Sequence, residues 1–144
     1  MKVERVEHVA IATRDLEESK RALERVFGLT LESETEVAVY GVRMAMYRAG
    51  ETSLELMQGP ADTPIVGKWL GSGEGLFHLC LEVDDVRAAL ADLRARGIRL
   101  LTAEPVVGHG GALVAFVDPA DTAGVLFEIA EPAPPDSKSR AASK

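Results

Sequence analysis

The chain lacks several features that would indicate particular protein classes. Its 144 residues include one cysteine, Cys80, so no disulfide can form within the chain, and it has no C-x-x-C motif for zinc or redox chemistry. Lysine and arginine number 16 against 23 acidic residues, and the net charge of −7 argues against a nucleic-acid partner. No run approaches 18 apolar residues, and the first residues lack the apolar segment of a signal peptide. We therefore expect a cytoplasmic protein with no membrane partner.

What the chain does have is an ordinary globular composition. It is 47% hydrophobic and 27% charged, and its length suits one domain with a proper core. Residues 132–144 hold three of the seven prolines and almost no large apolar side chain. Such a stretch cannot bury enough surface to become ordered. We predict a domain over residues 1–131 followed by a disordered tail over residues 132–144.

The domain sequence repeats itself. His8 and His78 each lie in a strand-like stretch, and an aspartate follows seven residues later in both copies, at Asp15 and Asp85. An amphipathic segment then ends at a glycine, 20 residues after the first histidine and 19 after the second. Three further strand-like stretches follow in each copy, which indicates an internal duplication. The prediction is an α+β fold with two β-α-β-β-β modules, at about residues 1–60 and 73–131.

The predicted elements have conventional signals. Asp15, with Glu18 as capping-box partner, and Asp84 or Asp85 can cap the two helices. One face of the first helix carries Leu16, Leu23, Val26 and Phe27, and the inner stripe of the second carries Val86, Leu90 and Leu93. The predicted strands are 6–12, 29–31, 42–47, 54–57, 76–83, 98–100, 113–117 and 125–130. Residues 61–75 join the modules and include a turn at Thr63-Pro64 with Trp69.

Side-chain alternation along four of these strands places histidines and glutamates on the same face. With a period of two, the more apolar face of each strand should cover its helix. The opposite faces then carry four residues at matching places in the two copies: His8, Glu55, His78 and Glu128. Two imidazoles and two carboxylates suit a borderline divalent metal such as cobalt, nickel, manganese, iron or zinc. The alternative is a pair of structural histidines with solvated glutamates, but the coincidence in both copies favours a shared metal site.

The third histidine lies in a glycine-rich stretch, residues 107–111. His109, Gly110 and Gly111 could let the backbone approach a ligand and offer N–H groups to an anion, or could simply form a turn. The stretch matches neither nucleotide-binding glycine pattern. Cys80 has no nucleophile context, and we interpret it as a small packing residue.

The sequence resembles the vicinal oxygen chelate (glyoxalase/bleomycin-resistance) superfamily, and within it the methylmalonyl-CoA epimerase family. The similarity covers residues 3–131. The stretches that carry it are Glu-His-Val-Ala-Ile-Ala at 7–12, Gly41-Val42, 54–57, 63–70, 73–78, 82–86, Glu104-Pro105, 108–111 and 124–128.

This resemblance implies paired modules that form a curved mixed sheet around a divalent metal, usually cobalt. By matching positions, the ligands would be His8, Glu55, His78 and Glu128. It also implies an isomerase that inverts the carbon between a thioester and a carboxylate through an enolate. Glu128 is then the expected catalytic base, an acyl-CoA is the substrate, and the protein is a homodimer.

One position departs from the pattern of some epimerases. They carry a glutamate three residues after the glycine of the Gly41-Val42 motif, whereas this chain has Met44. Methionine transfers no proton, so the base for the second face is open between Glu55, a water and His109. Tyr40 replaces a polar residue before that glycine, which leaves the acyl group open. The expected substrate-binding residues are Tyr40, Met44, His109, Gly110 and Gly111.

Three functions follow from these observations. The first is a metal-dependent epimerase of methylmalonyl-CoA or a related 2-substituted acyl-CoA. The second is a glyoxalase I-type lyase or isomerase, which uses the same ligand types and the same enolate chemistry. The third is a non-catalytic small-molecule binding or resistance protein, a class that commonly loses metal ligands. Retention of all four candidate ligands favours an enzyme.

Overall fold

The computed structural model describes residues 1–38, 41–60 and 74–135. The chain forms two compact units: the first unit is residues 8–78, and the second unit is residues 1–7 together with the residues from 79 onward. Tyr40, the predicted turn at Thr63-Pro64 with Trp69, and residues 136–144 of the predicted tail lie outside the described residues. Within the described ranges, no helix is long and apolar enough to cross a membrane.

Both halves of the chain have the element order β-α-β-β-β. The first half comprises β1 (Val3–Ala12), α1 (Leu16–Phe27), β2 (Leu31–Val37), β3 (Val42–Ala49) and β4 (Thr52–Gln58). The second comprises β5 (Gly75–Val83), α3 (Val86–Ala95), β6 (Val106–Val107), β7 (Leu113–Val117) and β8 (Phe127–Glu131), with 3-10 turns η2 (His109–Gly111) and η3 (Pro119–Asp121).

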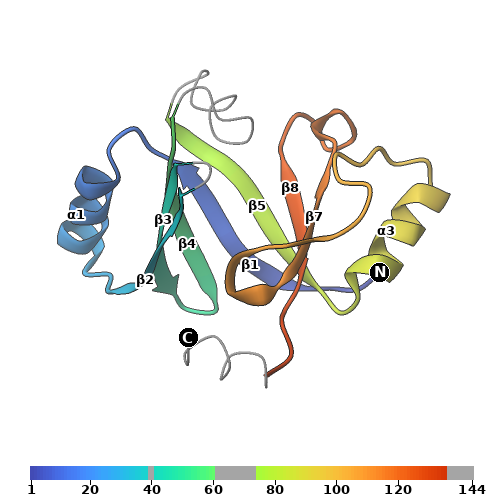
Figure 1. Ribbon diagram of the computed structural model, residues 1–144, viewed down its shortest axis with the longest axis horizontal. Coiled ribbons are helices and arrows are strands. Elements are labelled where there is room, and N and C mark those ends of the chain that lie inside the picture. The colour runs from blue at the N-terminus through green and yellow to red at the C-terminus, as the bar shows by residue number, and fades with distance from the viewer. Residues whose placement is uncertain (39–40, 61–73, 136–144) are drawn as a thin grey trace. The chain divides into compact units, whose positions relative to one another are not determined.

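The strands of the two halves are also ordered alike. Neighbouring strands run β2-β3-β4-β1 in one half and β6-β7-β8-β5 in the other (Figure 1). The first strand of each half is parallel to the last, and the remaining pairs within each half are antiparallel. The α+β class, the mixed sheet and the β-α-β-β-β pattern predicted from the sequence are confirmed.

In the first unit, α1 begins as the sequence predicts. The Asp15 side chain accepts a hydrogen bond from the Glu18 backbone N–H at 2.9 Å, and Gly28 ends the helix in the left-handed conformation, φ 65°. In the expected capping box, the Asp15 N–H would donate to the Glu18 side chain. It donates instead to Thr13 Oγ1 at 3.2 Å. The Leu16 N–H donates to Gln58 Oε1 at 2.7 Å, which ties the start of the helix to the end of β4.

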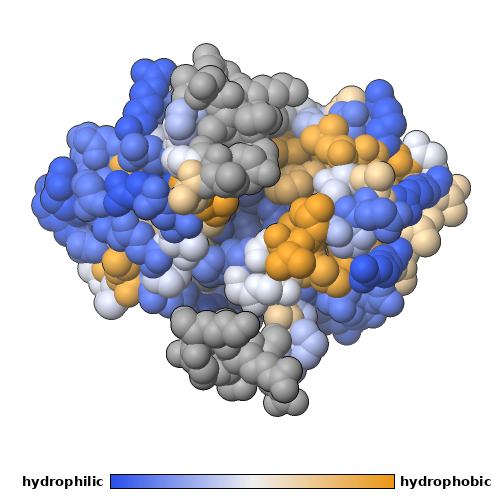
Figure 2. All heavy atoms as spheres, in the orientation of Figure 1, coloured by the Kyte–Doolittle hydropathy of each residue, from blue (hydrophilic) through white to orange (hydrophobic). Residues whose placement is uncertain are grey.

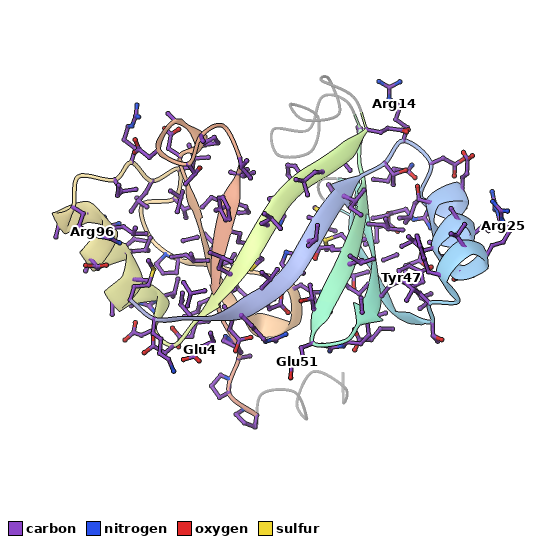
Figure 3. All side chains as sticks on the ribbon, turned by 180° about the vertical axis from the view of Figure 1, so that it is seen from behind. Glu4, Arg14, Arg25, Tyr47, Glu51 and Arg96 are labelled. Carbon is purple, nitrogen blue, oxygen red and sulfur yellow. The ribbon has the colours of Figure 1, made fainter. Side chains whose placement is uncertain are left out.

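The core of the first unit lies between α1 and one face of the sheet. Leu16, Tyr47 and Leu56 are fully or almost fully buried there, and Tyr47 points toward α1 (Figure 3). The predicted apolar face of α1 is only partly buried. Val26 and Phe27 are 59% and 69% exposed, because Leu23 is the last helical residue that packs on this core and the final turn continues past it.

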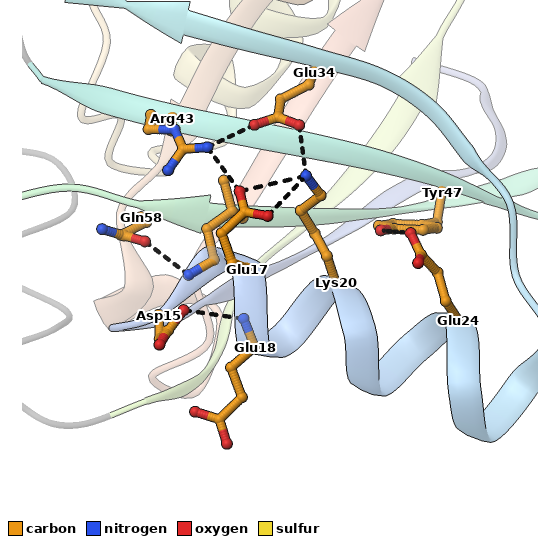
Figure 4. Close-up of polar contacts among 10 residues, drawn as sticks. Asp15, Glu17, Glu18, Lys20, Glu24, Glu34, Arg43, Tyr47 and Gln58 are labelled. Carbon is orange, nitrogen blue, oxygen red and sulfur yellow. Dashed lines mark hydrogen bonds and ion pairs between the residues drawn. The ribbon is translucent and has the colours of Figure 1, made fainter.

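Hydrophilic side chains predominate on the surface around α1 (Figure 2). Lys20 and Arg43 each pair with both Glu17 and Glu34, at distances of 2.7–3.3 Å, so the four charges form a closed ring (Figure 4). Hydrogen bonds from these two cations lower the pKa of the Glu17 and Glu34 carboxyl groups. The ring fastens α1 to strands β2 and β3.

In the second unit, Asp85 caps α3 by accepting from the Ala88 N–H at 2.8 Å. The predicted stripe, Val86, Leu90 and Leu93, is buried in one cluster with Val83, Ala115 and Ile129.

One predicted strand in the second unit is wrong. Residues 98–100 form only an isolated bridge, from Leu100 to Val117, and the regular partner of β7 is β6. The Arg99 N–H donates to Asp121 Oδ2 at 2.7 Å, and the Phe116 N–H donates to Thr102 Oγ1 at 3.1 Å. Because side chains take these two N–H groups, a longer backbone ladder does not form.

Candidate metal centre

In the first unit, the paired strands β1, β4 and β3 have one face that packs beneath α1 and an opposite face that carries Glu55. Ile11, Leu56 and Ala45 lie opposite one another in register, and all three pack in the core beneath α1. The neighbouring register row is Ala10, Glu55 and Met46. Since successive side chains alternate, Glu55 lies on the face away from α1. The alternation predicted from the sequence is confirmed here.

His8, Glu55 and His78 meet on the first unit. Their ligand atoms all lie within 4.8 Å of one another, and the three residues are only 6%, 4% and 3% exposed. The two Nε2 atoms of the histidines are 2.9 Å apart, although 70 residues separate them in the sequence. β1, β4 and β5 each supply one member of this triad.

Ring packing orients the histidines. The His8 and His78 rings meet edge to face, with centroids 5.1 Å apart and planes at 70°. The buried Phe77 ring packs on His78 in a similar way, with centroids 4.8 Å apart. Aromatic pairs favour this arrangement, so Phe77 helps to hold the His78 ring in place.

The triad fits a divalent metal. The 2.9 Å between the two Nε2 atoms is a hydrogen-bond distance, and the ligand atoms of all three residues lie close enough together for one ion to reach them. A set of two imidazoles and one carboxylate suits borderline first-row ions rather than calcium or thiolate-preferring ions. Three protein ligands leave coordination positions for a substrate or a further ligand, as catalytic metal sites do.

Glu128, the fourth predicted ligand, belongs to the second unit. It lies on β8, the strand equivalent to β4, and is 6% exposed. Its register neighbour is Cys80, whose thiol donates to Glu128 Oε1 at 3.7 Å. Cys80 is fully buried with Val114 and Ala130, in agreement with a packing role. Membership of Glu128 in one ligand set with the triad stays a prediction.

The other predicted site residues have different placements. Met44 lies on β3 opposite Met57 of β4, on the same face as Glu55. His109, Gly110 and Gly111 form the exposed turn η2 of the second unit. The sequence reasoning missed Met46 and Ala10, the two register neighbours of Glu55. Strand alternation indicated the face, but only the strand register identifies these two neighbours.

Comparison with known proteins agrees with the fold. The family model of the Glyoxalase/Bleomycin resistance protein/Dioxygenase superfamily matches residues 7–116, and the chain belongs to this superfamily. Bovine mitochondrial methylmalonyl-CoA epimerase is 35% identical over 128 residues, which are 87% of this chain and 73% of that protein. The ethylmalonyl-CoA/methylmalonyl-CoA epimerase of Cereibacter sphaeroides is 30% identical, over 87% of this chain and 96% of its own.

Solved structures extend the likeness to three dimensions. A variant of Streptomyces coelicolor methylmalonyl-CoA epimerase, solved with 2-nitronate-propionyl-CoA, matches with a TM-score of 0.85 and 33% identity. The match covers 92% of this chain and 96% of that one. Several relatives of this fold and sequence are therefore methylmalonyl-CoA epimerases, and at least one of them was solved with an acyl-CoA ligand.

Proposed function

We propose that this protein is a metal-dependent epimerase that acts on methylmalonyl-CoA or a related 2-substituted malonyl-type thioester. The observation that carries the proposal is the buried triad of His8, Glu55 and His78, with ligand atoms within 4.8 Å of one another. The names of the relatives at 30–35% identity supply the substrate class.

The same triad, with Glu128 as its proposed fourth member, would hold the metal. Cobalt is our preferred ion, and nickel, manganese, zinc and iron suit the same donors. Glu128 enters the set because it occupies on β8 the place that Glu55 occupies on β4. A bound ion would act as a Lewis acid toward the thioester carbonyl and so stabilise negative charge that develops there.

The chain's carboxylates would move the proton. In the first half-reaction the bond from hydrogen to C2 breaks, the proton passes to Glu128, and the electron pair moves into the thioester as an enolate. Return of a proton to the opposite face of C2 inverts the centre. Glu55 is the carboxylate of the first unit beside Met44 and Met46, which carry no exchangeable proton, so we assign the second transfer to Glu55 or to a water next to it.

The deciding experiment measures deuterium incorporation at C2 of the substrate. The purified protein with Co²⁺ and one enantiomer of methylmalonyl-CoA in D₂O should incorporate deuterium at C2 and invert the centre. Glu128→Gln should keep the fold and abolish exchange. No exchange with the wild-type protein, together with turnover of the glutathione–methylglyoxal hemithioacetal, would favour a glyoxalase I-type enzyme. Lack of metal binding after reconstitution would favour a non-catalytic binding protein.

A further inference from the structure

Three of the four methionines of the chain gather on the face that carries Glu55. Met46 of β3 lies directly opposite Glu55 of β4 in the strand register. Met57 follows Glu55 by two residues on β4, and Met44 lies opposite Met57. All of these residues belong to the first unit, so their arrangement is part of one compact body.

The methionines stand beside small residues of β1. Ala10 is the register neighbour of Glu55 on β1, and Ala12 is the register neighbour of Met57. Met46, Met57, Ala10 and Ala12 are all less than 8% exposed. Side chains opposite one another on adjacent strands lie about 5 Å apart, and those two residues apart on one strand lie about 7 Å apart. Glu55 therefore has Met46 beside it on β3, Met57 next on the same face of β4, and Ala10 beside it on β1.

We propose that Met46 and Met57 receive the alkyl substituent on C2 of the substrate and so determine which acyl groups the enzyme accepts. This inference rests on the proposed function. Around C2 of a 2-alkylmalonyl thioester, the thioester and the carboxylate are polar and the alkyl group is apolar. If the polar groups face the triad, the alkyl group is the part that an apolar surface next to Glu55 can accommodate.

The flexibility of methionine side chains also indicates how strictly the enzyme should discriminate between alkyl groups on C2. The unbranched methionine side chain has three rotatable bonds and fills gaps of irregular shape. A closely shaped apolar pocket separates substrates that differ by one methylene by roughly 10–200-fold. Because the surface of Met46 and Met57 can adjust, we expect the wild-type kcat/KM values for ethylmalonyl-CoA and methylmalonyl-CoA to differ by less than about tenfold.

The test compares three thioesters in one deuterium-exchange assay with Co²⁺-loaded protein: methylmalonyl-CoA, ethylmalonyl-CoA and malonyl-CoA, which has no alkyl group. Met46→Ala and Met57→Ala should raise the ratio of ethylmalonyl to methylmalonyl kcat/KM by about tenfold, since each removes bulk beside the substituent. The rate with malonyl-CoA normalises for any change in metal content. Calorimetric titration with racemic ligands, which undergo no net reaction, should give dissociation constants whose ratio shifts in the same direction.

Two further variants keep the test decisive. Met46→Leu and Met57→Leu nearly conserve volume and should fold even where the alanine variants do not, but the stiffer branched chain should lower the ethylmalonyl to methylmalonyl ratio severalfold. Leu54→Ala is the matched control, because Leu54 lies on β4 but packs in the core beneath α1. It should leave the ratio unchanged.

The outcomes separate this inference from the function on which it rests. Wild-type protein that exchanges none of the three thioesters overturns the proposed function. Exchange by wild-type protein, combined with the wild-type ratio in all four methionine variants, overturns the role of Met46 and Met57 and leaves the epimerase standing.

Discussion

At the scale of single residues, the chemistry of the candidate centre depends on Glu55 close to two buried imidazoles. A carboxylate removed from water requires compensation by hydrogen bonds, opposite charge or a metal ion. His8 and His78 supply nitrogen donors to the same small volume, within 4.8 Å. We therefore expect each of the three residues to contribute to the affinity for a bound divalent ion.

We predict that Glu55→Ala weakens Co²⁺ binding by at least about tenfold, because even residues that only orient a ligand change metal affinity by 10–100-fold. Isothermal titration of Co²⁺ into metal-free protein measures the effect. Leu54→Ala, on the same strand but in the core beneath α1, is the control and should bind as the wild type does. Equal affinities for Glu55→Ala and wild type would remove Glu55 from the ligand set.

A second prediction concerns Asp121, which lies in the second unit. Hydrogen bonds from the Arg99 side chain and backbone N–H lower the pKa of Asp121 to about 2 from an ordinary value of 3.8. A lowered folded-state pKa gives stability above the unfolded-state pKa that is lost as the pH falls through the folded value. The wild type should therefore have a higher Tm than Asp121→Asn, with the largest difference above about pH 4 and a smaller one toward pH 2.

Thermal melts at several pH values test this directly. In an Arg99→Gln background the same aspartate substitution should have a smaller pH-dependent effect between pH 2 and pH 4, because only the backbone N–H of residue 99 still donates to Asp121. A wild-type difference that stays constant over that range would contradict the assignment.

At the scale of elements, the two helices start in the same way in both halves. Asp15 and Asp85 each accept a hydrogen bond from the N–H three residues later, at 2.9 and 2.8 Å. Loss of such a cap costs about 1 kcal/mol of the free energy of unfolding. We predict that Asp15→Ala and Asp85→Ala each lower it by about that amount in urea denaturation. Asp15→Asn and Asp85→Asn keep an acceptor and should cost less, and equal losses for Ala and Asn would argue against the caps.

The extent of the core beneath α1 explains why the predicted apolar face of this helix is only partly buried. The apolar spacing of α1 places Val26 and Phe27 near the line of Leu16, but spacing alone does not say how far the core beneath the helix extends. Leu23 is the last residue of α1 that packs on that core, so the last turn of α1 is exposed.

At the scale of the whole molecule, the three residues of the triad belong to one compact unit although they are far apart in the sequence. The first unit begins at His8 and ends at His78, and Glu55 lies on β4 between them. An ion held by all three would link His8 and His78 to Glu55 on β4. Binding to the folded state alone stabilises by about 2.7 kcal/mol when the ligand concentration is 100 times Kd.

We therefore predict that Co²⁺ raises Tm and that EDTA reverses the rise. The shift should grow with metal concentration, as mass action requires. In His78→Ala the same addition of Co²⁺ should change Tm much less. An identical shift in wild type and His78→Ala would mean that the stabilising ion binds elsewhere.

By itself the sequence determined what local rules control: the duplicated element order, the helix caps at Asp15 and Asp85, and the strand alternation that places Glu55 away from α1. These follow from steric periodicity and short-range hydrogen bonds, so they can be recognised without a structure. Only the tertiary structure decided which distant residues meet, because strand pairing sets the register. It brought His8 within 2.9 Å of His78 across 70 residues, placed Met46 opposite Glu55, and reduced the predicted strand at 98–100 to a single bridge.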